Sequence, residues 1–156
     1  MTLIKAVGSG FARLPSSCPT DGSPLAFKAV ERAVEFARDI AATVVFLTVV
    51  EPFHIISIES EQLTSTRDSY ERLADMQAAQ FLAEAEMKAR ERGVTCHTVS
   101  VESDKVHLAI IDTAIAHSCD LIAIASHGRS GVSALVLGSV TAKVLSHSQI
   151  PVLVYR

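Results

Sequence analysis

The chain has few cysteines and no surplus of positive charge. Its three cysteines, Cys18, Cys96 and Cys119, are an odd number with wide spacing and no Cys-x-x-Cys pair. Such a set is typical of reduced thiols in the cytoplasm and argues against a disulfide framework or a zinc site. With 14 basic and 17 acidic residues, the formal net charge is -3. We therefore expect no nucleic-acid partner and no attraction to an anionic membrane.

Long hydrophobic runs are absent as well. The sequence has no stretch of 18 apolar residues that would cross a membrane, and Gly8 and Gly10 interrupt the N-terminal segment before a signal core forms. We expect a cytoplasmic protein without membrane contact. The 156 residues, 49% of them hydrophobic, suit one compact domain spanning residues 1–156, with an atypical N-terminal segment at 1–18.

Apolar runs alternate with helical patterns along the chain. Thr43–Val50 and Asp120–Ala125 are nearly unbroken apolar runs, typical of parallel strands covered on both faces, whereas Thr95–Val101 alternates and predicts a strand near a sheet edge. We expect three helical stripes to pack on this sheet. They are Ala29, Ala33, Phe36, Ala37 and Ile40; Leu73, Met76, Ala79, Ala83 and Met87; and Val106, Ile110 and Ala114. The order predicts an α/β fold: a single doubly wound, Rossmann-like domain with a five-stranded, mainly parallel sheet and helices on both faces.

Turn and cap residues give the expected helix boundaries. Ser23 followed by Pro24 predicts the start of the first helix, Gly93 the end of the second, and Asp104 a cap for the third. Residues 51–69 are polar and irregular, and we expect a mobile surface segment there.

The position of the first strand has two alternatives. Leu3–Val7 forms it with a long loop behind, or Phe11–Leu14 forms a degraded strand. Glycine, proline and serine residues around both segments oppose a longer strand.

The most informative segment is residues 125–140, which read Ala-Ser-His-Gly-Arg-Ser-Gly-Val-Ser-Ala-Leu-Val-Leu-Gly-Ser-Val. A glycine-bearing loop here joins an apolar strand to the start of a helix. Glycines allow a backbone to approach an anion closely, and the first turn of a helix offers unpaired N–H donors with a partial positive charge. The segment therefore predicts a phosphate site.

The same segment resembles the universal stress protein family. The nucleotide-binding branch of that family has the pattern G-2x-G-9x-G-[ST], and here Gly128, nine further residues, Gly138 and Ser139 match it, while Ala125 stands at the first glycine. A final run, Ile150–Tyr155, resembles the last strand of the family. The resemblance covers roughly residues 19 to 156 and implies a fold of the adenine nucleotide alpha hydrolase-like type.

The resemblance also implies a ligand, ATP, which Mg²⁺ can accompany on its phosphates. It implies that Asp21 in a Pro-x-Asp-x-Ser segment contacts the nucleoside, that the backbone at Val49 holds the adenine, and that the glycine-serine segment holds phosphates. Arg129 either donates to a terminal phosphate or faces water. The candidate nucleotide-binding residues are Pro19, Asp21, Val49, Ala125, Ser126, Gly128, Arg129, Gly138, Ser139 and Val140.

Each of these residues has a plainer alternative. Asp21 is equally suited to capping the first helix, and Val49 to the core. Ser139 has an alternative as a helix cap, and Gly138 as the relief of a tight turn. The methyl group of Ala125 either crowds the nucleotide and blocks a positive φ, or leaves binding unchanged.

The sequence assigns no catalytic residue. His127 has no nucleophile or carboxylate partner, the other histidines lack metal-ligand spacing, and neither GxxxxGK[ST] nor GxGxxG occurs. We expect an ATP-binding regulator of the stress response with at most slow hydrolysis, not an enzyme. It would act on an unknown protein partner as a homodimer paired through the C-terminal strand. The alternative is a dimeric interaction module that binds no nucleotide.

Overall fold

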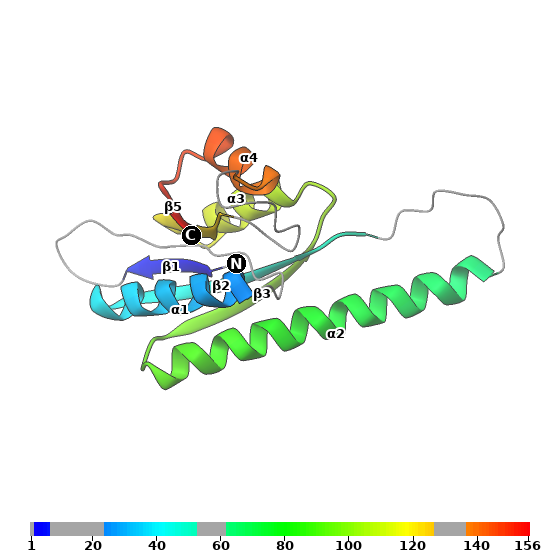
Figure 1. Ribbon diagram of the computed structural model, residues 1–156, viewed down its shortest axis with the longest axis horizontal. Coiled ribbons are helices and arrows are strands. Elements are labelled where there is room, and N and C mark those ends of the chain that lie inside the picture. The colour runs from blue at the N-terminus through cyan, green and yellow to red at the C-terminus, as the bar shows by residue number, and fades with distance from the viewer. Residues whose placement is uncertain (1, 7–23, 53–61, 127–136) are drawn as a thin grey trace.

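The computed structural model describes residues 2–6, 24–52, 62–126 and 137–156. These residues form alternating strands and helices (Figure 1). In chain order the elements are β1 (Thr2–Ala6), α1 (Pro24–Asp39), β2 (Ala42–Val50), α2 (Gln62–Glu91), β3 (Cys96–Glu102), α3 (Val106–Ala116), β4 (Leu121–Ala125), α4 (Ser139–His147) and β5 (Val152–Tyr155).

The strands form one sheet in the order β3-β2-β1-β4-β5. β2 pairs in parallel with β3, and β4 with β5. β1 lies in the centre and runs antiparallel to both of its neighbours. The expected α/β class is confirmed, although the central strand is reversed relative to the other four. β1 agrees with the alternative that begins near Leu3, while Phe11–Leu14 lies outside the described residues.

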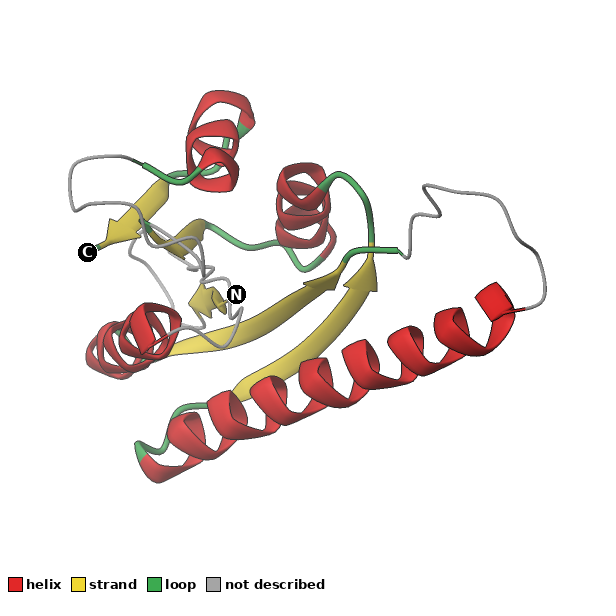
Figure 2. Ribbon diagram, turned by 45° about the vertical axis from the view of Figure 1, so that its right-hand side comes forward, coloured by secondary structure: helices red, strands yellow, loops and turns green. Residues whose placement is uncertain are grey.

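Helices cover both faces of the sheet, as Figure 2 shows. Alternate residues of β2 point to opposite sides: Val44 and Phe46 pack with α1 and α2, whereas Val45 and Leu47 pack with α3 and α4. Because both faces of β2 and β4 are buried, their sequences lack polar alternation. β3 lies at one edge, as its alternating sequence predicts, and β5 at the other.

Two helix boundaries confirm the sequence prediction. α1 begins at Pro24. At the end of α2, Gly93 has a φ of +67° and donates its N–H to the carbonyl of Arg90 at 3.0 Å, while Val94 donates to Ala89 at 2.9 Å. This pair of bonds is a Schellman motif, which requires the left-handed conformation that glycine adopts without strain.

The predicted cap of α3 is wrong. The residue that precedes the helix is Lys105, which makes no side-chain cap bond. Ser103 Oγ instead accepts the N–H of Lys105 at 3.1 Å. This bond closes a turn ahead of the helix and does not cap it, since a short side chain reaches the backbone N–H two residues further on.

Two predictions for α2 are wrong. The helix begins at Gln62, so the last eight residues of the expected irregular segment at 51–69 are helical. Residues 53–61 lie outside the described residues. The predicted stripe from Leu73 to Met87 is exposed, and the buried face consists of other residues. The residues that pack on the sheet are Ala78, Leu82, Ala85 and Ala89.

Candidate functional site

The N-terminus of α4 is tied to the end of β4 by hydrogen bonds. Ser126, which follows β4 and is buried, accepts the N–H of Gly138 at 2.8 Å through its carbonyl. Thr141, also buried, donates its Oγ1–H to the carbonyl of Ala125 at 2.9 Å. Ser126 in turn donates its N–H to the carbonyl of Tyr155 at 2.7 Å, at the end of β5. These bonds fix the first turn of α4 against the carboxyl edge of the sheet.

This turn presents three backbone N–H groups. The first four N–H groups of a helix have no acceptor within it. Here the N–H of Gly138 donates to Ser126, so that donor is engaged by the chain itself. The N–H groups of Ser139, Val140 and Thr141 have no acceptor among the described residues. Together with the helix dipole, they can bind an anion.

Two alternatives are wrong: Ser139 is not the helix cap, and Gly138 does not relieve a tight turn. Gly138 is the residue that caps α4, with no side-chain cap bond, and Ser139 is the first helical residue. Gly138 has a φ of -58° and a ψ of 149°. Any residue adopts this conformation, so no tight turn requires glycine here.

Val49 and Ser126 lie level with each other at the same edge of the sheet. Thr2 of β1 pairs with Phe46 on one side and Ala123 on the other. Val49 lies three residues after Phe46, and Ser126 lies three residues after Ala123, on strands that run in the same direction. Because they are two strands apart, about 10 Å separates them. This distance suits a ligand that contacts both.

Val49 itself lies within β2, where it pairs with Val101 and packs, half-buried, against the core on the α3 and α4 side. Its side chain is therefore part of the core, as the plainer alternative holds, and only its backbone remains a candidate for contact with a base.

Ala125 is buried in the opposite half of the core, with α1 and α2. Its φ is not positive, since within the described chain only Ala41 and Ser118 combine a positive φ with a side chain. The backbone at this position therefore does not need glycine. The remaining predicted site residues, Pro19, Asp21, Gly128 and Arg129, lie outside the described residues, as does His127.

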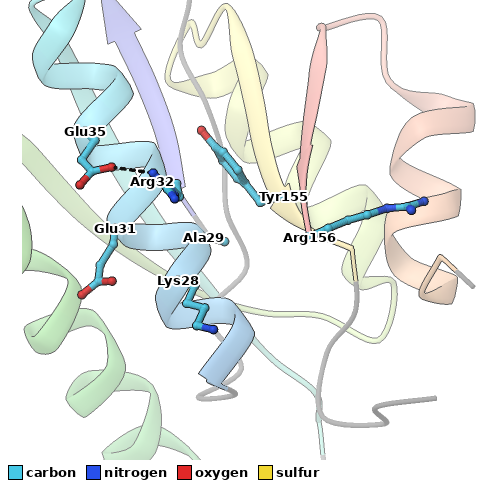
Figure 3. Close-up of a pocket in the computed structure, with 7 residues that line it drawn as sticks. All are labelled: Lys28, Ala29, Glu31, Arg32, Glu35, Tyr155 and Arg156. Carbon is cyan, nitrogen blue, oxygen red and sulfur yellow. Dashed lines mark hydrogen bonds and ion pairs between the residues drawn. The ribbon is translucent and has the colours of Figure 1, made fainter. Parts of the chain in front are cut away.

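A pocket that the sequence reasoning missed lies beside this edge, between α1 and the end of β5 (Figure 3). It encloses ≈ 510 Å³. Both carboxylates on its wall are in ion pairs: Glu31 with Lys88 at 3.4 Å, and Glu35 with Arg92 at 3.2 Å and Arg32 at 3.4 Å. The sequence feature that indicates this pocket is the pair of basic residues Lys28 and Arg32, which lie one helical turn apart on α1. The pocket is lined by Lys28, Ala29, Glu31, Arg32, Glu35, Tyr155 and Arg156.

Two further properties concern the described residues as a whole. They contain no group of three or more His, Cys, Asp or Glu side chains placed to hold a metal ion. No helix among them is long and apolar enough to span a membrane.

The known proteins to which this chain is similar include several universal stress proteins. A universal stress protein of Methanocaldococcus jannaschii, MJ0531, is 28% identical over 141 residues, which cover 88% of this chain and 79% of the relative. The structure of universal stress protein UspA from Lactobacillus plantarum has a TM-score of 0.71 at 26% identity, covering 94% of this chain and all of that one. A crystal structure of a universal stress protein in complex with cAMP has a TM-score of 0.66 at 25% identity, covering 90% of this chain and 95% of that one.

The sequence profile of one family matches most of the chain. The match covers residues 17–156, from the segment before α1 to the end of β5, and it includes the strand-to-helix segment described above. The chain therefore belongs to the Universal stress protein family.

Proposed function

We propose that this protein binds an adenine nucleotide whose phosphates lie at the N-terminus of α4. The observation that carries the proposal is the set of three N–H groups at Ser139, Val140 and Thr141, which lack acceptors among the described residues in a turn anchored to β4 by two hydrogen bonds. A related universal stress protein forms a complex with cAMP, which supports a nucleotide as the anion.

ATP is the nucleotide that we propose, with Mg²⁺ bound by phosphate oxygens and water. Ser139 offers a hydroxyl beside its N–H group, and the backbone near Val49 lies on the same edge of the sheet for contact with the base. Pro19, Asp21, Gly128 and Arg129 complete the proposed site.

The proposed role is regulatory and not catalytic. The first turn of α4 carries two hydroxyls and a valine, and none of these side chains is a base that activates water. Bound nucleotide would change the order of the surrounding loops, and thereby the affinity for an unknown protein partner in the stress response. We place the protein in the cytoplasm, which the reduced thiols of Cys96 and Cys119 support.

We further propose a homodimer that pairs through β5. This strand is at an edge of the sheet, and all four of its residues are half-buried apolar or aromatic residues. Such an edge favours pairing with a second strand. Light scattering at micromolar concentration is expected to give at least twice the mass of the chain, and a monomer would reject the pairing.

The second candidate is an interaction module of the same fold that binds no nucleotide. Ala125 at the first glycine of the motif favours it. Against it, the backbone at Ala125 is not in the conformation that demands glycine. An Ala125→Gly variant should therefore bind ATP with the affinity of the parent chain.

Mass analysis of small molecules released from freshly purified protein tests the two candidates. Adenine nucleotide at near-stoichiometric yield, or calorimetric binding of added Mg-ATP, supports the first. Protein that is empty and also gives no heat with Mg-ATP supports the second and contradicts the proposal.

A further inference from the structure

α2 carries apolar residues on two opposite faces. The inner face packs on the sheet through Ala78, Leu82, Ala85 and Ala89. The second set, which we call the outer stripe, is exposed to solvent. Its apolar members are Leu73, Met76, Ala83 and Met87, and the polar Gln80, whose amide donates to Glu84 at 3.0 Å, lies between Met76 and Ala83.

The outer stripe points directly away from the domain. Residues turn by about 100° each around a helix, so the centre of the outer stripe lies about 180° from the centre of the inner face. Figures 1 and 2 show α2 as the outermost layer on its side of the sheet, with its N-terminal half extending beyond the strands.

The three largest side chains of the outer stripe are each more than half exposed. Leu73 is 56% exposed, Met76 70% and Met87 53%. An apolar patch of this kind on a folded surface marks an interaction site. The spacing of the stripe, alternately three and four residues, is the spacing with which one helix packs along another.

We propose that the outer stripe of α2 pairs with the outer stripe of a second copy of this chain, in antiparallel orientation about a two-fold axis that crosses the stripe at the level of residue 78 along the helix. In this register Leu73 faces Ala83 of the second copy, and Met76 faces Gln80 of the second copy. Since the stripe points away from the sheet, the described strands and the other described helices of the two copies would lie on opposite sides of the paired helices.

Charged residues beside the stripe favour a second copy of this chain as the partner, and they favour the antiparallel over the parallel orientation. Arg72 and Glu86 lie on the same flank. Antiparallel pairing places Arg72 of each copy beside Glu86 of the other, which gives two attractive contacts related by the two-fold axis. Parallel pairing would place Glu86 against Glu91 of the other copy, which is repulsive. Glu86 accepts a bond from Arg90 at 2.7 Å within α2 and retains a second oxygen for Arg72.

This inference does not depend on nucleotide binding or on pairing through β5. If β5 also pairs, each chain has two separate two-fold contacts. Loss of the α2 contact lowers the mass of the assembly in either case: to that of a single chain if β5 does not pair, and to that of the β5 dimer if it does.

Sedimentation equilibrium of the full chain tests the surface. Met76→Glu should lower the average mass to half or less, because it places a charge in the middle of the stripe. Since Met76 is exposed in the single chain, its circular dichroism should not change. The matched control is Ile115→Glu, an exposed apolar residue of α3, which should keep the parental mass. A parental mass for Met76→Glu, or an equal loss in both variants, would overturn the proposal.

Cross-linking tests the direction of pairing. In a chain with Cys18 and Cys96 replaced by serine, Gln77→Cys places a thiol close to the two-fold axis, whereas Glu91→Cys places it far along the helix. A short bismaleimide should join two copies of Gln77→Cys and not of Glu91→Cys. Cross-linking of both variants would indicate parallel pairing, and cross-linking of neither would show that the stripes do not meet; each result overturns the proposal.

Discussion

The hydrogen bonds of Ser126 and Thr141 hold the start of α4 in place, and the bond of Ser126 decides which backbone N–H groups there remain available to a ligand. The sequence singles out Gly138 and Ser139 from their spacing, and both lie where β4 and α4 meet. The spacing does not reveal that the N–H of Gly138 is taken by Ser126, because that bond depends on how the end of β4 lies against the helix. The donors that remain belong to Ser139, Val140 and Thr141, and only Ser139 and Val140 are among the residues that the motif indicates.

His107 should make stability depend on pH. Its ring lies 5.4 Å from that of His147, edge to face. Burial lowers the pKa of His107 below its ordinary value, with Lys143, His147 and Lys105 acting in the same direction. The unfolded chain therefore binds the proton more readily, so the free energy of unfolding should fall as the pH drops through the ordinary histidine pKa of 6.5.

Urea titrations at about pH 7.5 and about pH 5.5 check this effect. His107→Gln should lose less stability between the two values than the parent chain does. His97→Gln, at an exposed position of β3, is the control for replacing a histidine that does not belong to the pair formed by His107 and His147. Identical losses in all three proteins would contradict the role of His107.

At the scale of elements, the sequence predicts where strands and helices occur better than which face of a helix is buried. β2 and β4 follow their apolar runs within one residue, because a strand buried on both faces permits few polar residues. α2 contains two stripes with helical spacing. The stripe with the larger apolar residues is the one that the sequence predicts to be buried, and this prediction is wrong. The face with three alanines and one leucine is buried instead, because its small side chains allow the helix to approach the sheet more closely.

The inner and outer faces of α2 should respond differently to truncation. Leu82 is 8% exposed, so Leu82→Ala should lower the free energy of unfolding by about 2–5 kcal/mol. Leu73→Ala should change it by no more than about 0.5 kcal/mol. Urea unfolding at low protein concentration, where association is negligible, measures both. A larger loss for Leu73→Ala would mean that the helix presents its other face to the sheet.

At the scale of the whole molecule, the sequence predicts the layers of the domain but not the direction of its central strand. β1 pairs over five residues with β2 and over three with β4, antiparallel to both. It also precedes residues 17–156, the part that matches the family. An apolar run has the same pattern in both directions, so no periodicity in the sequence encodes the direction of β1.

Ile4→Pro tests the position of β1. Ile4 pairs with Val44 on one side and Leu121 on the other. Proline has no N–H to give to either neighbour. The variant should lose about 1–3 kcal/mol of unfolding free energy, the cost of a buried carbonyl left without a partner. Ile4→Val, which keeps the N–H, is the control, and equal stability of the two would place β1 outside the sheet.

The proposed nucleotide site depends on main-chain N–H groups at the start of α4. Calorimetric titration of Mg-ATP into two variants of Ser139 tests most directly whether these groups bind the phosphates. Ser139→Ala removes only the hydroxyl, whereas Ser139→Pro also removes the N–H. The first helical position accepts proline, and the φ and ψ of Gly138 before it are compatible with a following proline. Loss of one hydrogen bond to a charged group predicts that Ser139→Pro binds at least about tenfold more weakly than Ser139→Ala. Equal affinity of the two variants, with α4 intact in both, would contradict the account.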